Sequence, residues 1–189
     1  LIKQGAGALI LTGANIYTGG TTVSAGVLQG NTTSLQGNIL DNATVMFDQA
    51  TIGTYNGILS GSGNLIKQGA GTVNFLNDSS GFTGTVAING GAFVINGKLG
   101  GTCTVSSAGL LSGTGTIDTL INNGLVSPGS SIGTLTVNGN YTQGSAGTLA
   151  IEIASNGATD LLQVTGAAAL NGALRINPQP GIYLAGTRY

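Results

Sequence analysis

Short runs along the chain alternate between apolar and polar residues, so that every second side chain is apolar. Leu9 and Leu11 show this near the start, Leu135 and Val137 show it later, and residues 149–153 repeat it. Glycine and asparagine separate the runs, and no stretch repeats its apolar residues with the period of a helix. The pattern predicts short strands joined by turns, without helices.

A heptapeptide, Leu-Ile-Lys-Gln-Gly-Ala-Gly, occupies residues 1–7 and recurs unchanged at residues 65–71. Units that recur at a fixed spacing usually bury their apolar faces on one another and form an elongated stack. We expect the spacing between the two copies to hold three coils of about 21 residues, which gives about nine coils in the chain. The predicted fold is all-β, a single-stranded, three-sided parallel β-helix with Val, Ile and Leu inside and Thr, Ser, Asn and Gln outside.

Lys3 and Lys67 occupy the same position in the two heptapeptides. We expect both to lie on exposed turns, where a charge aids solubility and discourages lateral association of strands.

Charge is scarce and restricts the function. Only 6% of the residues are charged and the net charge is −1, against about 25% charged residues in an ordinary soluble domain. The hydrophobic content of 41% favours a buried core over disorder. A nucleic-acid partner is excluded, because it requires clustered basic residues. The basic residues are instead scattered over the chain: Lys3, Lys67, Lys98, Arg175 and Arg188.

Two residues have the chemistry of a nucleophile, but the chain contains no histidine to activate either. Ser131 lies in Gly129-Ser130-Ser131-Ile132-Gly133, which matches the G-x-S-x-G nucleophile elbow, yet no helix is predicted after it and no Ser-His-Asp triad can form. Cys103 lies in an alternating run and is predicted to be a small, unreactive core or strand residue. We therefore expect no catalytic residues.

Metal and cofactor sites are not expected either. Zinc prefers His and Cys, and calcium requires several converging carboxylates. The six acidic residues are dispersed along the chain: Asp41, Asp48, Asp78, Asp118, Glu152 and Asp160.

Two parts of the chain resemble a known family. Residues 1–29, which begin with the heptapeptide and end in Val-Ser-Ala-Gly-Val-Leu-Gln, resemble the passenger-associated repeat of bacterial autotransporters, the monomeric type V secretion proteins. Residues 123–143, 149–153, 160–164 and 186–189 are similar to the C-terminal passenger region of that family, which is often called the autochaperone.

The resemblance implies a right-handed parallel β-helix that is exported through the periplasm and crosses the outer membrane through its own C-terminal β-barrel, with the barrel-assembly machinery as a partner. It divides the chain into a stalk, residues 1–122, with repeats at 1–29 and 65–94, and an autochaperone-like region, residues 123–189, of capping coils. We expect this region to stop before the barrel linker and the sequence to come from a longer protein.

The function expected from these features is that of a noncatalytic stalk and folding module, which presents an N-terminal effector at the bacterial cell surface. Within it, residues 124–176 concentrate the alternating apolar strands and are expected to fold first. The alternative is an adhesive surface that self-associates or binds host glycans through ladders of Thr and Asn. A β-helix polysaccharide lyase is a third class, but it requires acids and a basic residue clustered on one face, and the sequence shows no such cluster.

Overall fold

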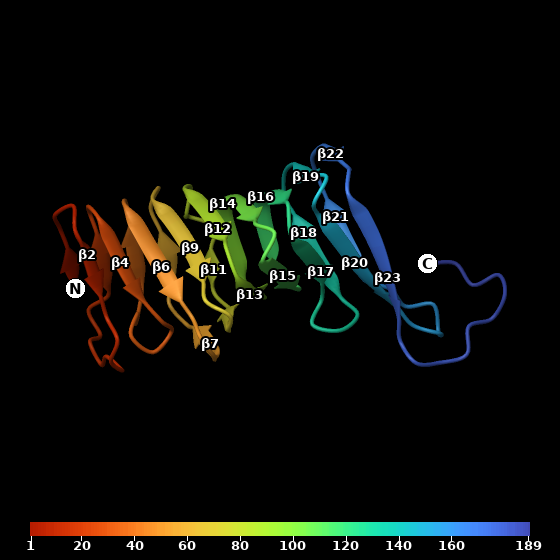
Figure 1. Ribbon diagram of the computed structural model, residues 1–189, viewed down its shortest axis with the longest axis horizontal. Helices are drawn as coiled ribbons and strands as arrows, with labels where there is room; N and C mark the ends of the chain where they lie inside the picture. Colours follow the sequence, from red (N-terminus) through yellow and green to blue (C-terminus); the bar gives the residue numbers. More distant parts are fainter.

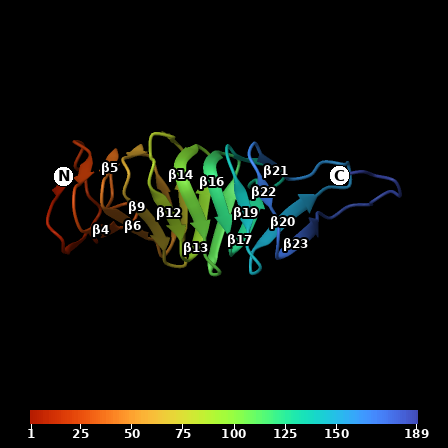
Figure 2. The same cartoon turned by 90° about the horizontal axis from the view of Figure 1, so that it is seen from above.

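The strands of the chain wind into a solenoid of parallel coils. The computed structural model describes residues 1–189, and it contains strands and turns but no helix. Each pairing between strands is parallel. Figures 1 and 2 show the coils stacked along the long axis, with the two chain termini at opposite ends. The predicted parallel β-helix is confirmed, and no helix is available to cross a membrane.

The coils have three faces, each a ladder of strands. Face 1 begins with the four-stranded sheet of β1 (Ile2–Lys3), β3 (Thr21–Val23), β5 (Ile39–Asp41) and β8 (Leu59–Ser60). Face 2 contains β2 (Ala8–Ile10), β4 (Val27–Gly30), β6 (Thr44–Asp48), β9 (Asn64–Gln68), β12 (Thr85–Ile88), β19 (Tyr141–Gln143) and β22 (Ala168–Ala169). Face 3 is the seven-stranded sheet of β7 (Ile52–Tyr55), β10 (Thr72–Phe75), β13 (Gly91–Ile95), β15 (Gly109–Gly113), β17 (Leu125–Pro128), β20 (Thr148–Ile153) and β23 (Ala173–Pro178).

Two longer strands, β14 (Lys98–Val105) and β16 (Thr116–Asn122), bend around the corner between faces 1 and 2. Their second halves continue face 2. Their first halves continue face 1 together with β11 (Asp78–Ser79), β18 (Thr134–Val137) and β21 (Leu161–Val164). The first strand of face 3 is β7, so the seven coils from Ile39 onward have a strand on that face and the two coils before them have none.

The two copies of the repeat lie on different faces, which corrects the expected coil length. The hydrogen-bonded register carries Ile2 to Thr22 in the second coil, to Leu40 in the third and to Ser60 in the fourth. The second heptapeptide starts only at Leu65, in strand β9 of face 2. The spacing between the copies therefore corresponds to three coils and one further face, and each of these three coils is shorter than the repeat predicted. The repeated sequence recurs at a different corner of the solenoid.

The interior is filled by columns of apolar side chains that stack from coil to coil. One column on face 2 contains Leu28, Val45, Leu65, Val86, Cys103 and Leu120, all in register and all at most 1% exposed. Cys103 is thus the buried strand residue that its alternating context predicts, and burial raises the pKa of its thiol to about 12.

Four aromatic rings stack through the middle of the solenoid, which the composition alone did not predict. Successive ring centroids lie 5.2 Å apart from Phe47 to Tyr55, 5.5 Å from Tyr55 to Phe75 and 5.6 Å from Phe75 to Phe93. Each of the four is at most 1% exposed. Aromatic pairs at such separations stabilise a core beyond the area that they bury, so this stack ties three consecutive coils together.

Candidate functional site

The repeat lysines lie inside the solenoid, not on exposed turns as predicted. Lys3 is 6% exposed and Lys67 is fully buried. Both follow the strand alternation: Lys67 lies two residues after buried Leu65, and the intervening Ile66 faces outward. A buried ammonium group must find hydrogen-bond acceptors, because it loses the solvation that water gives it.

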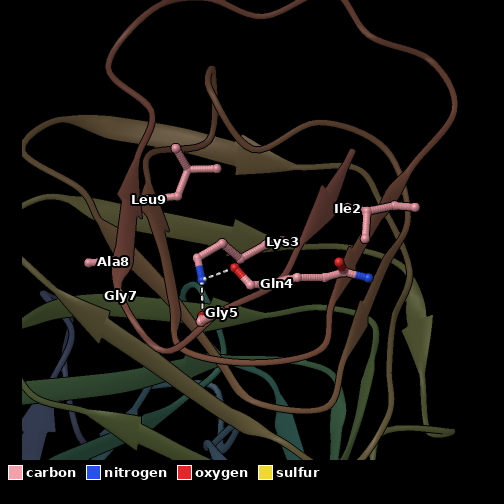
Figure 3. Close-up of a pocket in the computed structure, with 7 residues that line it drawn as sticks. All are labelled: Ile2, Lys3, Gln4, Gly5, Gly7, Ala8 and Leu9. Carbon is pink, nitrogen blue, oxygen red and sulfur yellow. Dashed lines mark hydrogen bonds between the residues drawn. The ribbon is translucent and has the colours of Figure 1, made fainter.

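Each lysine donates to three backbone carbonyls at a corner. Lys3 Nζ donates to the carbonyl oxygens of Gln4 at 3.2 Å, Gly5 at 2.6 Å and Ala25 at 2.9 Å. Figure 3 shows the amine turned over the turn that follows β1, with its bonds to Gln4 and Gly5, beside an open hollow of about 350 Å³. The first two acceptors belong to the turn of the same coil and the third, Ala25, belongs to the turn of the next coil.

Lys67 repeats this geometry at the corner between faces 2 and 3. Its Nζ lies 2.9 Å from the carbonyl oxygens of Gln68, Gly69 and Gly90. Gly90 is in the turn of the next coil, at the repeat position that corresponds to Ala25. One sequence pattern therefore builds the same three-carbonyl cradle at two different corners.

Glycine allows the two turns of each cradle to nest. Gly91 has a φ of 62°, and a Cβ there would lie 2.3 Å from the carbonyl oxygen of Gly71 and 2.5 Å from that of Gly69. Its counterpart Gly26 has a φ of 71°, and a Cβ there would lie 2.7 Å from Lys3 Nζ. A side chain at either position would push the turns apart, so the glycines are part of the cradle.

Two amides continue the pattern toward the C-terminus. Asn122 Nδ2 donates to the carbonyl oxygen of Thr148 at 3.0 Å and to Tyr141 Oη at 3.2 Å, and its Oδ1 accepts from Gly124 N at 3.1 Å. These bonds connect the Asn122 turn with the coil that follows. The amide thus joins two coils as the lysines do, but without a charge.

Gln143 is the nearest counterpart of the lysines. Its Nε2 lies 3.3 Å from the carbonyl oxygen of Gly147, 2.5 Å from that of Asn171 and 2.9 Å from that of Ala173, so its two N–H groups are shared among three acceptors. Gly147 follows in the same coil, and the other two acceptors lie in the next coil. Tyr141 Oη donates to Gln143 Oε1 at 2.7 Å and completes the network.

No carboxylate forms a salt bridge with either buried lysine, and the one ion pair in the structure joins exposed Lys98 and Asp78 at 3.1 Å. Burial lowers the pKa of Lys67, and the negative charge of Asp48 opposes that change. The carbonyl dipoles are therefore the direct partners of the charge, and they offset part of its desolvation cost.

Asp41 is the opposite case, a buried acid that is only half satisfied. It ends β5 in the same column as Lys3 and Val23 and is fully buried. Oδ1 accepts from Ala43 N at 3.0 Å, whereas Oδ2 has no partner. Burial raises the pKa of Asp41 to about 6, and the backbone hydrogen bonds of Ala43 and Val45 oppose the change.

The predicted elbow serine lies on the loop between β17 and β18, and no helix follows it. Ser131 is exposed, and its Oγ accepts from Gln179 Nε2 at 3.3 Å. The same Nε2 donates to Glu152 Oε2 at 3.3 Å, so the Gln179 amide bridges the Ser131 hydroxyl and the Glu152 carboxylate. Asp160 fixes the loop, since its carboxylate accepts from Gly133 N at 2.9 Å and from Glu152 N at 2.8 Å. The arrangement gives Ser131 no base, and its lack of activity stays a prediction.

The repeat is recognised by comparison with known proteins. The passenger-associated-transport-repeat family matches residues 1–29 and 65–95, the two segments that contain the lysine cradles. The chain is also 35% identical over 136 residues to the adhesin BmaC autotransporter of Brucella suis biovar 1 (strain 1330). The predicted resemblance to autotransporter passengers is confirmed. The match to that adhesin covers 59% of this chain and 4% of the relative, so the chain spans a small part of that relative's length.

The lysine cradle predicts a large effect for Lys67→Met. Methionine has a similar length but donates no hydrogen bond. The carbonyls of Gly69 and Gly90 then lose their donor, whereas the carbonyl of Gln68 keeps its hydrogen bond from Gln49 N at 3.0 Å, and the free energy of unfolding should fall by about 3 kcal/mol. Lys98→Met is the matched control, because its ion pair is exposed and should contribute less than about 1 kcal/mol. Urea denaturation followed by circular dichroism measures both, and equal effects of the two substitutions would contradict the cradle.

Asp41 predicts a pH dependence. Because the folded-state pKa of about 6 exceeds the ordinary value of 3.8, the contribution of this group to stability is fully present below pH 3.8 and is lost as the pH rises through 6. Asp41→Asn should raise the free energy of unfolding at pH 7 by about 2–3 kcal/mol and change it little at pH 3.5. Urea denaturation of both proteins at the two pH values measures this, and an equal difference at both would exclude titration of Asp41 as the cause.

Proposed function

We propose that this chain is a noncatalytic stalk and folding module of an autotransporter passenger. The observation that supports it is the uninterrupted ladder of coils from β1 to β23, in which each coil hydrogen-bonds to the next. Such a rod would hold an N-terminal effector away from the bacterial cell surface, after export through the periplasm and across the outer membrane. Its own C-terminal β-barrel and the barrel-assembly machinery would be its partners.

The folding role is proposed for residues 123–189, and residues 1–122 would form the stalk. Leu135, Val137 and Tyr141 are buried, and the Asn122, Tyr141 and Gln143 network joins successive coils. Leu174 is 65% exposed and Ile176 is 47% exposed, at an apolar hollow of about 380 Å³, in a strand that pairs with a neighbour on one side only. The core of the folding region is proposed to be β18 and β19, whose inward side chains are buried between coils.

A matched pair of substitutions tests the order of folding. Leu28 in the second coil and Leu135 in β18 are both fully buried, so aspartate at either site buries a charge of the same kind. If the C-terminal region folds first, Leu135→Asp should abolish surface protease protection of the whole chain, whereas Leu28→Asp should expose only the first coils. Display of the full-length protein on cells measures this, and equal loss from both would rule out a C-terminal nucleus.

An adhesive function is the second candidate, and the outer side of face 2 is the observation that favours it. Thr85, Thr102 and Thr119 form a column in register, and Thr85 Oγ1 donates to Asn64 Oδ1 at 2.7 Å. These are the polar ladders expected of a surface that self-associates or binds host glycans. The similarity to a protein named as an adhesin adds to this candidate.

Substituting the threonine column separates the two candidates. The triple change Thr85→Ala, Thr102→Ala and Thr119→Ala leaves the interior intact, because these side chains face outward. If the chain is a stalk alone, binding of the purified protein to host cells and to itself should be unchanged by the substitutions. A large loss of either binding, with an unaltered circular dichroism spectrum, would establish the adhesive role instead.

A further inference from the structure

The apolar columns by themselves do not fix how one coil sits on the next. Leu65 stacks on Val86, which stacks on Cys103, and these side chains recur every second residue along each strand. A shift of two residues keeps every inward side chain inward and exchanges one aliphatic contact for another. In a sequence this rich in similar strands, such a shift would cost little in the aliphatic column of face 2.

The lysine cradle removes this freedom. In the native register Lys67 lies beside Ile88, the last residue of β12, and its Nζ reaches Gly90 in the turn beyond that strand. A two-residue shift would place Lys67 beside Val86, in the middle of the strand, where the backbone carbonyls already accept from the neighbouring coils. The ammonium group would then be buried without its third acceptor.

Backbone shape restricts the register in the same way. The turn that contains Gly91 nests on the turn that contains Gly71, with no room for even a Cβ between them. The two turns fit only when β9 and β12 end at the same level. The Lys67 amine and the glycines of the two turns therefore favour the same register at this corner.

The same device is present at three further positions. Lys3 reaches Ala25, Asn122 reaches Thr148 and Gln143 reaches Asn171, in each case from one coil to the coil on its C-terminal side. Buried polar side chains that set the register of otherwise uniform apolar interfaces are known from coiled coils, where they reduce stability and increase specificity.

We propose that the repeat lysines, with Asn122 and Gln143, set the register of the stack. Each selects the one alignment in which its coil and the next can satisfy all buried donors, and the passenger-associated repeat supplies this device to whichever corner it occupies. The proposal deepens the folding role given above, but it depends only on the fold and can be tested on the purified chain.

Engineered disulfides across β9 and β12 report the register directly. Ile66 and Ala87 are in register and both are half-exposed, so Ile66→Cys with Ala87→Cys should form a disulfide in the native alignment. Ile66→Cys with Thr85→Cys is the slipped pair, because Thr85 lies two residues from the native partner, too far for a disulfide without a shift. Native Cys103 is fully buried and does not interfere.

With Lys67 present, the native pair should form at least about a hundredfold more disulfide than the slipped pair, as expected when a slip leaves a buried charge unpaired. In a Lys67→Met background, the amount of disulfide formed by the slipped pair should be within about tenfold of the amount formed by the native pair. Lys98→Met is the control and should leave the hundredfold preference unchanged. An unaltered preference in the Lys67→Met protein would overturn the proposal.

Lys3→Met covers the case in which Lys67→Met does not fold. Lys3 belongs to the first coil, so its loss leaves the remaining stack in place. The native reporter is then Ile2→Cys with Thr22→Cys, which are in register. The slipped reporter is Ile2→Cys with Ser24→Cys, which detects a slip in the direction opposite to that of the Thr85 reporter, because the other neighbour, Gly20, has a φ of 68° and does not accept a side chain. Slipped disulfide at this corner supports the proposal, and exclusive native disulfide contradicts it. Neither result depends on surface display, so a failure of the proposed stalk function would be seen separately.

Discussion

The structure depends on one constraint, which is that every coil must turn its corners directly against the turns of its neighbours. Strands satisfy their backbone groups in the parallel ladder, but some turn carbonyls, such as those of Gly5 and Gly69, have no backbone donor. At the corners of Lys3 and Lys67 those carbonyls face inward and accept from a buried amine. Since the turns also touch through Gly26 and Gly91, the corner combines close backbone contact with a fixed hydrogen-bond donor. The spacing and alignment of the coils follow from these contacts.

This constraint explains why the repeated sequence recurs at different sides of the solenoid. The heptapeptide encodes a strand end, an inward lysine and a nested turn, and each of these needs only a following coil to rest on. At Lys3 the following coil supplies Ala25, and at Lys67 it supplies Gly90. The cradle requires no residue that is found on one particular face. Two copies of such a unit can therefore be separated by any number of residues that places the second copy at a corner. A spacing of three coils and one face meets this condition.

The fold was predictable from the sequence, whereas the polar interior was predictable only in part. Alternation and repetition predicted parallel coils, and the alternation around Cys103 predicted its burial correctly. The same alternation in Leu65, Ile66 and Lys67 places the lysine inward, but the general rarity of buried lysines favoured an exposed turn. The acceptors cannot be found from the sequence, because Gly90 becomes a partner of Lys67 only once the number of residues in a coil is known. The aromatic stack was missed for a related reason, since Phe47 precedes a corner and Tyr55 follows it, and only the fold brings their rings together.

The column at the corner between faces 2 and 3 shows how stability and specificity are divided along the solenoid. It contains Phe47, Lys67, Ile88, Val105, Asn122 and Gln143 in successive coils. The apolar members contribute stability through burial, and Phe47 also takes part in the aromatic stack. The polar members contribute less net stability, because each must first lose its water. Their directional bonds, however, give each coil a different partner requirement. A column of valine alone would contribute more stability but would accept many alignments. A long stack of similar coils can form correctly only if some of its layers accept a single alignment.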